Sequence, residues 1–371
     1  MSVQEGLEGV VALSSDICSI IDGVLRYRGY SIDDLAANVT FEECAYLLYH
    51  KDLPSQAQLQ AFKKELDAEW AIPAGVVQGL KLLPKGVVPM AALRTAASLL
   101  GNFDPEAEAT SAEANAKKAV RLLAKTGPLI GAYERIRRGQ EPVPAKAGKS
   151  IAWNFLWCLF GKEPTPTAEK SIDVALVLHA EHELNASTFC ARQTASTLSD
   201  IYSSIVSAIG TLKGPLHGGA NEQVMEMLLK IGPNADVEKW LDDALARKAK
   251  IMGFGHRVYK TGDPRARWLH DMSGRLTKGT PNEAFFKMSE RLEALMKSKK
   301  ALLPNVDFYS ATTYYALGIP TDLFTPIFVL SRMSGWCAHV LEQLADNRLI
   351  RPRAEYIGAP DRTVVPLAQR K

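Results

Sequence analysis

Two histidines lie in glycine-rich segments, a setting that favours contact with a small ligand. His217 stands in KGPLHGGAN (residues 213–221), and His256 stands in GFGHRVYKTGDPR (residues 253–265). Glycine lets the backbone approach a ligand closely, and the positive end of a following helix lowers the pKa of a histidine. A neutral imidazole can then donate a hydrogen bond without carrying a charge. One such histidine is more often structural, but two in glycine-rich turns favour catalysis.

A third histidine and one carboxylate stand in short polar segments. His182 follows His179 in HAEHELNAS (residues 179–187), and Asp307 follows an apolar residue in PNVDFYS (residues 304–310). The spacing predicts that His179 and His182 lie on one helix face, where they could share a metal ion. Because the sequence offers no third ligand at a suitable spacing, we expect no metal. A carboxylate placed like Asp307 is, on its own, usually a helix cap.

The common nucleotide and zinc motifs are incomplete in this chain. GKS at residues 148–150 resembles the end of a phosphate-binding loop, but the earlier glycine position holds Val143. GFG at residues 253–255 opens a dinucleotide fingerprint whose third glycine position holds Val258. A zinc-protease motif would need a second histidine where Ala186 stands. We therefore predict neither a nucleotide-phosphate loop nor a zinc-protease site.

Helical periodicity dominates the elements that must position these groups. Apolar side chains repeat with helical spacing from Phe41 to Tyr49, from Leu59 to Trp70 and from Leu198 to Leu212. Helix starts are indicated by four patterns that resemble capping boxes: Ser31-x-x-Asp34, Thr40-x-x-Glu43, Ser55-x-x-Gln58 and Thr280-Pro281-x-Glu283. The last of these patterns predicts a helix with Pro281 at its first position.

The best candidate for β structure is near the start of the chain. Ile17–Ile21 and Val24–Tyr27 flank Asp22-Gly23, a turn pair typical of a hairpin. We therefore predict an all-α fold with one small N-terminal β-hairpin. The segment at residues 139–150 has the composition of a surface loop. The segment from Leu349 onward lacks helical periodicity yet is rich in apolar residues. Two alternatives are equally open: this segment is a frayed tail in solvent, or it packs on the surface of a partner.

Composition narrows the class of protein. Among the 371 residues, 47% are hydrophobic and 23% are charged, with a net charge of +3, so no nucleic-acid partner is expected. The cysteines form no CxxC pair, which favours a reducing compartment over a disulfide framework. The first basic residue is Arg26, and the longest apolar stretch, 151–160, is far shorter than the roughly 20 residues that span a membrane. We expect a cytoplasmic protein with no membrane partner.

Taken together, these segments resemble the citrate synthase family. GFGHRVYKTGDPR fits a long signature of that family without a gap. KGPLHGGAN, HAEHELNAS, PNVDFYS, FTPIFVLSRMSGWCAH and LIRPR occur in the family's order, and the resemblance reaches back to YRGY at residues 27–30. It therefore covers essentially the whole chain. The length and short N-terminus resemble the compact citrate and 2-methylcitrate synthase branch.

The resemblance implies a specific reaction and a role for each catalytic group. The family condenses acetyl-CoA with oxaloacetate and water to give citrate and CoA, the entry step of the tricarboxylic acid cycle. By resemblance, Asp307 takes the methyl proton of acetyl-CoA, and His217 donates a hydrogen bond to the thioester oxygen. His256 donates to the carbonyl of oxaloacetate. The resemblance implies an enzyme with CoA as a co-substrate, no permanently bound cofactor and no metal.

The resemblance also implies the substrate contacts. The two carboxylates of oxaloacetate call for planar bidentate donors. The oxaloacetate residues implied are His182, Arg265, Arg332 and Arg351. The CoA residues implied are Lys260 and the turn formed by Met252, Gly253, Phe254 and Gly255, with Lys213 and Asn305 as further candidates.

The family fold is a homodimer of two-domain helical subunits. Mapped onto this chain, the large domain comprises residues 1–218 and 319–371, including the C-terminal arm, and residues 219–318 form a small mobile domain. Arg351 would then be supplied to the partner subunit. Three alternatives stay open: a 2-methylcitrate synthase that uses propionyl-CoA (or dual specificity), a non-catalytic homologue, and a metallohydrolase built on the histidines.

Overall fold

The computed structural model describes residues 5–7, 9–256, 259 and 262–370. These residues are mostly helical, which confirms the predicted all-α class. The helices are α1 (Ile32–Asn38), α2 (Phe41–His50), α3 (Gln56–Glu69), α4 (Ala74–Lys81), α5 (Pro89–Asn102), α6 (Ala112–Arg137), α7 (Ile151–Phe160), α8 (Pro166–His179), α9 (Ala186–Ala195), α10 (Ile201–Leu212), α11 (Ala220–Ile231), α12 (Val237–Ala246), α13 (Ala266–Thr277), α14 (Glu283–Lys300), α15 (Val306–Ala316) and α16 (Phe324–Ala345), with short 3₁₀ turns η1 (Glu5–Leu7), η2 (Thr321–Leu323) and η3 (Leu367–Gln369).

The predicted hairpin is present and is extended by one short strand. Strands β1 (Cys18–Ile21) and β2 (Val24–Tyr27) pair antiparallel around Asp22-Gly23, both of which have a positive φ. This left-handed turn suits the twist of the two strands. Strand β3 (Tyr30–Ser31) then pairs with β2. Strand β3 is not predictable from the sequence, because two residues are too few to show the alternation of apolar and polar side chains.

Helices α6 and α16 run through the core of the molecule, where they pack on each other. Helix α6 also packs closely on α7. That contact needs a glycine, because a Cβ at Gly131 would lie 2.6 Å from the carbonyl carbon of Cys158. Helix α16 is largely buried and carries Arg332 in the interior.

The helix starts predicted from capping boxes are mostly confirmed. Thr40 and Ser55 form complete capping boxes at α2 and α3, and Ser31 caps α1 by accepting the Asp34 N–H. The predicted start at Thr280 is wrong, since α14 begins at Glu283. The Thr280 hydroxyl instead donates to the Thr277 carbonyl at the end of α13, at 2.7 Å, so it closes the preceding helix.

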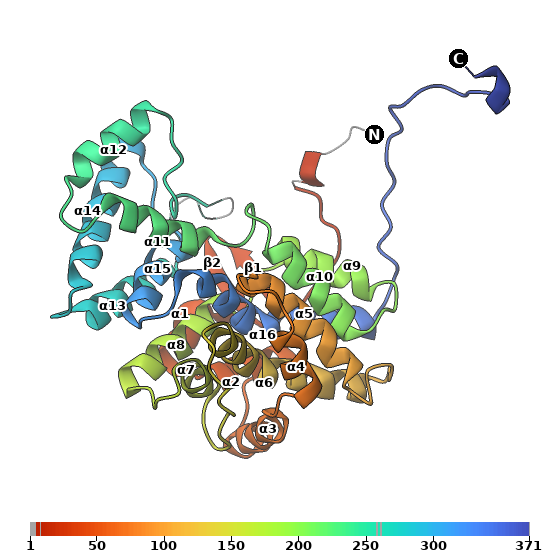
Figure 1. Cartoon of the computed structure of the whole chain (residues 1–371), viewed down its shortest axis with the longest axis horizontal. Helices are drawn as coiled ribbons and strands as arrows, with labels where there is room; N and C mark the ends of the chain where they lie inside the picture. The colour runs from red at the N-terminus through yellow and green to blue at the C-terminus, as the bar shows by residue number, and fades with distance from the viewer. Residues whose placement is uncertain (1–4, 8, 257–258, 260–261, 371) are drawn as a thin grey trace.

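Helices α11 to α15 gather on one side of the molecule (Figure 1). They pack on one another through the pairs α13–α15, α11–α15 and α12–α14. Contacts of α11 with α16 and η2, and of α13 with α8, join them to the remaining helices. Two predicted catalytic residues lie in this part of the chain: His256 between α12 and α13, and Asp307 in α15.

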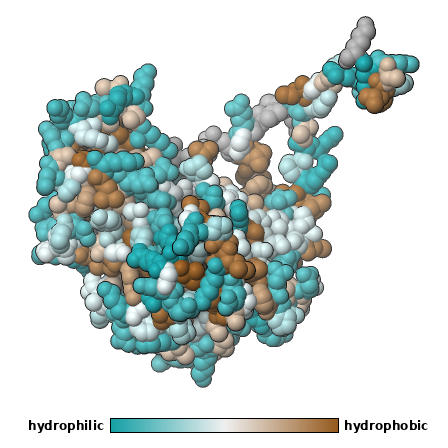
Figure 2. All heavy atoms as spheres, in the orientation of Figure 1, coloured by the Kyte–Doolittle hydropathy of each residue, from teal (hydrophilic) through white to brown (hydrophobic). Residues whose placement is uncertain are grey.

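The chain after α16 leaves the helical body as an extended segment (Figure 1). Figure 2 shows apolar residues on this tail, and the side chains of Tyr356, Ile357 and Val364 are 78%, 91% and 82% exposed. None of the described helices combines the length and the apolar character needed to cross a membrane.

Candidate active site

His256 lies in a cluster of three aromatic rings with Tyr259 and His182. The ring of His256 is 4.6 Å from that of Tyr259 and 5.3 Å from that of His182. The backbone N–H of Tyr259 donates to Nδ1 of His256 at 3.2 Å. Because Nδ1 accepts, a neutral His256 carries its proton on Nε2. The contact therefore makes Nε2 a hydrogen-bond donor.

His182 is held in the same cluster as a neutral group. Its Nε2 lies 3.2 Å from the hydroxyl of Tyr259. Burial lowers the pKa of His182 well below its ordinary value, and the charges of Arg265 and Arg332 lower it further. The residue therefore offers hydrogen bonds to a ligand without adding a charge.

His217 lies in the loop between α10 and α11, with its imidazole also held in one tautomer. Its Nε2 accepts the backbone N–H of Ser187 at 3.2 Å and lies 2.7 Å from the Ser187 hydroxyl. That hydroxyl also accepts from the indole N–H of Trp336 at 3.1 Å. A neutral His217 therefore carries its proton on Nδ1.

The pKa of His217 is lowered to about 4, by burial first and then by the Arg332 guanidinium. A position just before a helix predicts that the positive helix end lowers the pKa of His217. The structure gives a different cause, because α11 begins only at Ala220 and burial has the largest effect. The imidazole is neutral at pH 7, as the predicted role requires.

Asp307 is the second residue of α15, and its carboxylate does not cap the helix. The cap is Asn305, whose side-chain oxygen accepts the Asp307 N–H at 3.1 Å. Burial raises the pKa of Asp307 to about 6, the Arg265 charge opposes this shift, and the Asp263 charge adds to it. A carboxylate with a pKa near the working pH is suited to general-base catalysis.

Asn305 ties the helix that carries Asp307 to the turn that precedes His256. Its side-chain N–H₂ donates to the Gly255 carbonyl at 3.0 Å, and its backbone N–H donates to the Gly253 carbonyl at 2.9 Å. The turn needs glycine at residue 253, where φ is 84° and a Cβ would lie 2.8 Å from both Phe308 and Val224. Asn305 thus couples the base to the histidine loop.

Two buried arginines lie close enough to act on these groups. Arg265 is 3% exposed and donates from Nε and Nη2 to the Asp263 carboxylate at 2.9 and 2.8 Å. Asp263 also accepts the backbone N–H of Val306, at 3.0 Å, so it links Arg265 to the start of α15. Arg332 is 1% exposed and donates from Nε to the carbonyl of His179 at 2.8 Å.

The structure thus brings the three predicted catalytic residues and three of the four predicted oxaloacetate residues into one electrically coupled group. The charges of Arg265 and Arg332 act on both His182 and Asp307, and that of Arg332 acts on His217. Two buried cations beside neutral imidazoles and a carboxylate of raised pKa suit a small dianionic substrate.

Other predicted residues lie apart from this group. Arg351 is exposed on the extended tail, and it makes no hydrogen bond or ion pair with any described residue. Lys213 is exposed at the end of α10. The turn from Met252 to Gly255 adjoins the group through Asn305. Lys260 lies outside the described residues.

The predicted placement of His179 and His182 on one helix face is wrong. Helix α8 ends at His179, and His182 lies beyond it in the following loop. His179 is buried with its Nδ1 bound to the carbonyl of Ala175 at 2.8 Å, and burial lowers its pKa to about 3. Within the described ranges, no three His, Cys, Asp or Glu side chains form a group that could hold a metal ion.

Sequence reasoning missed three residues that position the site: Ser187, Tyr259 and Asp263. Each stands inside a quoted segment, within five residues of a predicted site residue, so proximity in sequence is the available signal. Their roles depend on contacts across the fold, such as that of Ser187 with His217, which sequence spacing does not reveal.

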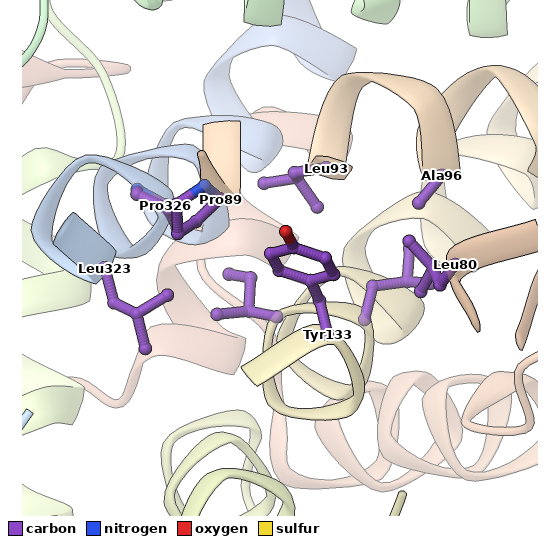
Figure 3. A pocket seen from close by; sticks show the side chains of 9 residues that line it. Leu80, Pro89, Leu93, Ala96, Tyr133, Leu323 and Pro326 are labelled. Atoms are coloured by element: carbon purple, nitrogen blue, oxygen red, sulfur yellow. The ribbon is translucent and has the colours of Figure 1, made fainter. Parts of the chain in front are cut away.

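An apolar pocket elsewhere in the molecule offers no such chemistry. A small apolar pocket lies between α4, α5, α6 and α16, lined by side chains that include Leu80, Leu93 and Leu323 (Figure 3). The hydroxyl of Tyr133 in its wall donates to the carbonyl of Val87. The lining contains no ionisable side chain other than this phenol, so it offers no acid–base chemistry at neutral pH.

Comparisons with known proteins give a consistent result. The family model described as citrate synthase, C-terminal domain, matches residues 6–353. The chain is 54% identical to "Citrate synthase 2" of Bacillus subtilis over 371 residues, which cover 100% of both chains. It is 45% identical to a 2-methylcitrate synthase of Shewanella oneidensis over 347 residues, 93% of this chain and 92% of that one.

A solved structure agrees in fold. The citrate synthase of Thermoplasma acidophilum, in ternary complex with carboxymethyl coenzyme A and oxaloacetate, matches with a TM-score of 0.93 and 33% identity. The match covers 100% of both chains.

Proposed function

The chain belongs to the citrate synthase family and is an enzyme, and from this premise we propose that its site condenses acetyl-CoA with oxaloacetate and water to give citrate and CoA. One observation carries the proposal. Two histidines of fixed tautomer, one of them with a lowered pKa, and a carboxylate of raised pKa lie around two buried arginines. These are the donors, base and anion-binding groups that such a condensation requires.

The first step forms the nucleophile. The Asp307 carboxylate takes a proton from the methyl group of acetyl-CoA, the C–H electrons form the carbon–carbon double bond of the enol, and the electrons of the thioester C=O double bond move to its oxygen. His217 donates from Nδ1, the nitrogen left protonated by its contact with Ser187, to the thioester oxygen. Because the imidazole is neutral, it stabilises the developing charge as a hydrogen-bond donor.

The second step forms the carbon–carbon bond. The enol carbon attacks the ketone carbon of oxaloacetate, and the electrons of the ketone double bond move to its oxygen. His256 donates from Nε2 to that oxygen, because its Nδ1 is occupied by the Tyr259 N–H. Water then attacks the thioester of the citryl product and releases citrate and CoA.

The buried arginines supply the substrate site. We infer that Arg265, Arg332 and His182 bind the carboxylates of oxaloacetate, supported by their burial and their mutual charge coupling. The tail residue Arg351 completes the site of the partner subunit in a homodimer, supported by its exposure on an extended segment. CoA lies along the turn from Met252 to Gly255, with Lys213, Lys260 and Asn305 as further contacts.

We further propose that residues 219–318 move as a small domain against residues 1–218 and 319–371. The proposal is supported by the packing of α11 to α15 on one another. His256 and Asp307 belong to the small domain, and His217 lies at its boundary with the large domain. Closure of the small domain would therefore bring the three side chains together and exclude water. We also propose that the enzyme works in the cytoplasm without a bound metal.

The acyl group is the most direct test of the reaction. We expect purified protein to form citrate from acetyl-CoA with a kcat/KM above that for propionyl-CoA. One methylene changes binding by about 1–3 kcal/mol, so the ratio should lie between roughly 10 and 200. Citrate and 2-methylcitrate would be separated by mass spectrometry. A preference for propionyl-CoA would make the protein a 2-methylcitrate synthase, and the absence of either product would reject the condensation.

The pKa of Asp307 sets the expected pH dependence. The base works only as a carboxylate, so kcat/KM for acetyl-CoA should fall about tenfold per pH unit below a pKa of about 6. His217 should not limit this range, because its pKa of about 4 keeps it neutral until lower pH. Circular dichroism at each pH would separate this loss from unfolding. A rate that stays flat down to pH 4.5 would contradict the assignment of Asp307.

A further inference from the structure

Glu181 is a buried carboxylate that the proposed reaction does not explain. Its side chain is 0% exposed, and it stands between α8 and α9, one residue before His182. Its Oε1 accepts from Nε2 of His339 at 3.1 Å, whereas its Oε2 is buried with no hydrogen-bond partner among the residues that the structure describes. A buried carboxylate oxygen without a donor costs free energy, so its retention calls for another role.

The unpaired oxygen lies beside Arg332. A Cβ placed on Gly335 would lie 2.3 Å from Oε2 of Glu181 and 3.3 Å from Cδ of Arg332. Glycine at this position therefore leaves the space that the Glu181 carboxylate fills, next to the stem of Arg332. Burial lowers the pKa of Arg332, and the Glu181 charge is the largest influence that opposes this shift.

The two site arginines are balanced by carboxylates in different ways. Arg265 gives Nε and Nη2 to Asp263 in a close ion pair. Arg332 makes one side-chain hydrogen bond to a described residue, from Nε to the carbonyl of His179, and no ion pair with Glu181. The Glu181 charge thus stabilises the guanidinium without occupying its Nη donors, which face no described acceptor and suit a substrate carboxylate.

A buried chain of side chains holds Glu181 in place. Nη1 of Arg192 donates to Nδ1 of His339 at 3.0 Å, so a neutral His339 carries its proton on Nε2 and donates it to Glu181. Arg192 is 4% exposed and is itself fixed by Gln343, at 3.0 Å, and by an ion pair with Glu342. The carboxylate has one preferred position as a result.

We propose that Glu181 is a positioning residue for oxaloacetate, acting through Arg332. Its charge keeps the buried guanidinium in place with its Nη donors open to a substrate carboxylate, and His339 keeps Glu181 there. The inference rests on the proposed function, because it assigns Arg332 to the substrate. It concerns binding of one substrate and leaves proton transfer by Asp307 unaffected.

The test compares wild-type protein with Glu181→Gln, which keeps the shape and the acceptor for His339 but removes the charge. We expect the KM for oxaloacetate to rise about tenfold or more, with kcat and the KM for acetyl-CoA changed less than about threefold. Calorimetric titration with oxaloacetate alone should show the same loss of affinity. Glu181→Asp, which keeps the charge, should recover most of it.

Two further variants make the result specific. His339→Asn frees Glu181 and should raise the oxaloacetate KM in the same direction, which also tests the inference if Glu181→Gln does not fold. Glu42→Gln removes another buried carboxylate, 2% exposed at the start of α2, and should leave that KM unchanged. An unaltered or lower oxaloacetate KM in Glu181→Gln, or an equal rise in Glu42→Gln, would overturn the inference. Wild-type protein that forms no citrate would instead reject the proposed function.

Discussion

Replacing Asp307 with Asn should reduce turnover by roughly 10²–10⁴-fold, equivalent to about 3–5 kcal/mol of transition-state stabilisation. The amide has the shape of the carboxylate but cannot take the methyl proton. Oxaloacetate should still bind, because Asp307 serves the other substrate. Steady-state rates together with titration of oxaloacetate would measure both effects. An exposed carboxylate of α12, Asp242, provides a matched control, and Asp242→Asn should retain full turnover.

The same variant should be more stable than wild type at high pH. Burial raises the pKa of Asp307 in the folded protein to about 6 from an ordinary 3.8, so its ionised form is less favourable in the folded than in the unfolded chain. This cost is full above pH 6, amounts to at most about 3 kcal/mol, and disappears below both pKa values. Asp307→Asn should therefore gain stability at pH 8 and none below pH 4. Near-normal turnover in this folded variant would reject Asp307 as the base.

Much of the helical architecture could be predicted from local sequence. The apolar period from Phe41 to Tyr49 and the capping boxes at Thr40 and Ser55 depend on residues a few positions apart, and the structure confirms them. The turn at Asp22-Gly23 is equally local, because both residues tolerate a positive φ. Where a competing local partner existed, as for the Thr280 hydroxyl at the end of α13, the pattern alone misplaced the helix start.

The chemistry of the site could be predicted only in part. Residue types and the family resemblance pointed to His217, His256 and Asp307, but the protonated nitrogen of each histidine depends on a tertiary or loop contact. Ser187 reaches the His217 loop from helix α9, and Tyr259 reaches back to His256 across a turn. The buried ion pair of Arg265 with Asp263 likewise appears only once the backbone is placed. Spacing identifies candidates, whereas the fold fixes their protonation and charge.

Arg351 should act in the site of the partner subunit. It opens the extended tail after α16, it is exposed, and it makes no ion pair with a described residue of its own chain. Facing an oxaloacetate carboxylate of the partner, its loss would cost about 2–5 kcal/mol, as for one member of a buried charged pair. Homodimers of Arg351→Ala should therefore be nearly inactive, as should homodimers of Asp307→Ala.

Heterodimers of these two variants distinguish the two geometries. If Arg351 acts across the interface, the Asp307→Ala subunit lends its intact arginine to the partner that keeps Asp307. One whole site then forms in each dimer, and turnover should recover to about half of the wild-type value, one of two sites. If Arg351 acts within its own subunit, each site carries one lesion and no activity returns. Differently tagged subunits, co-expressed and purified through both tags, would supply the heterodimer. Heterodimers that turn over no faster than either parent would refute the shared site, because intact groups from two chains would then have failed to complement each other.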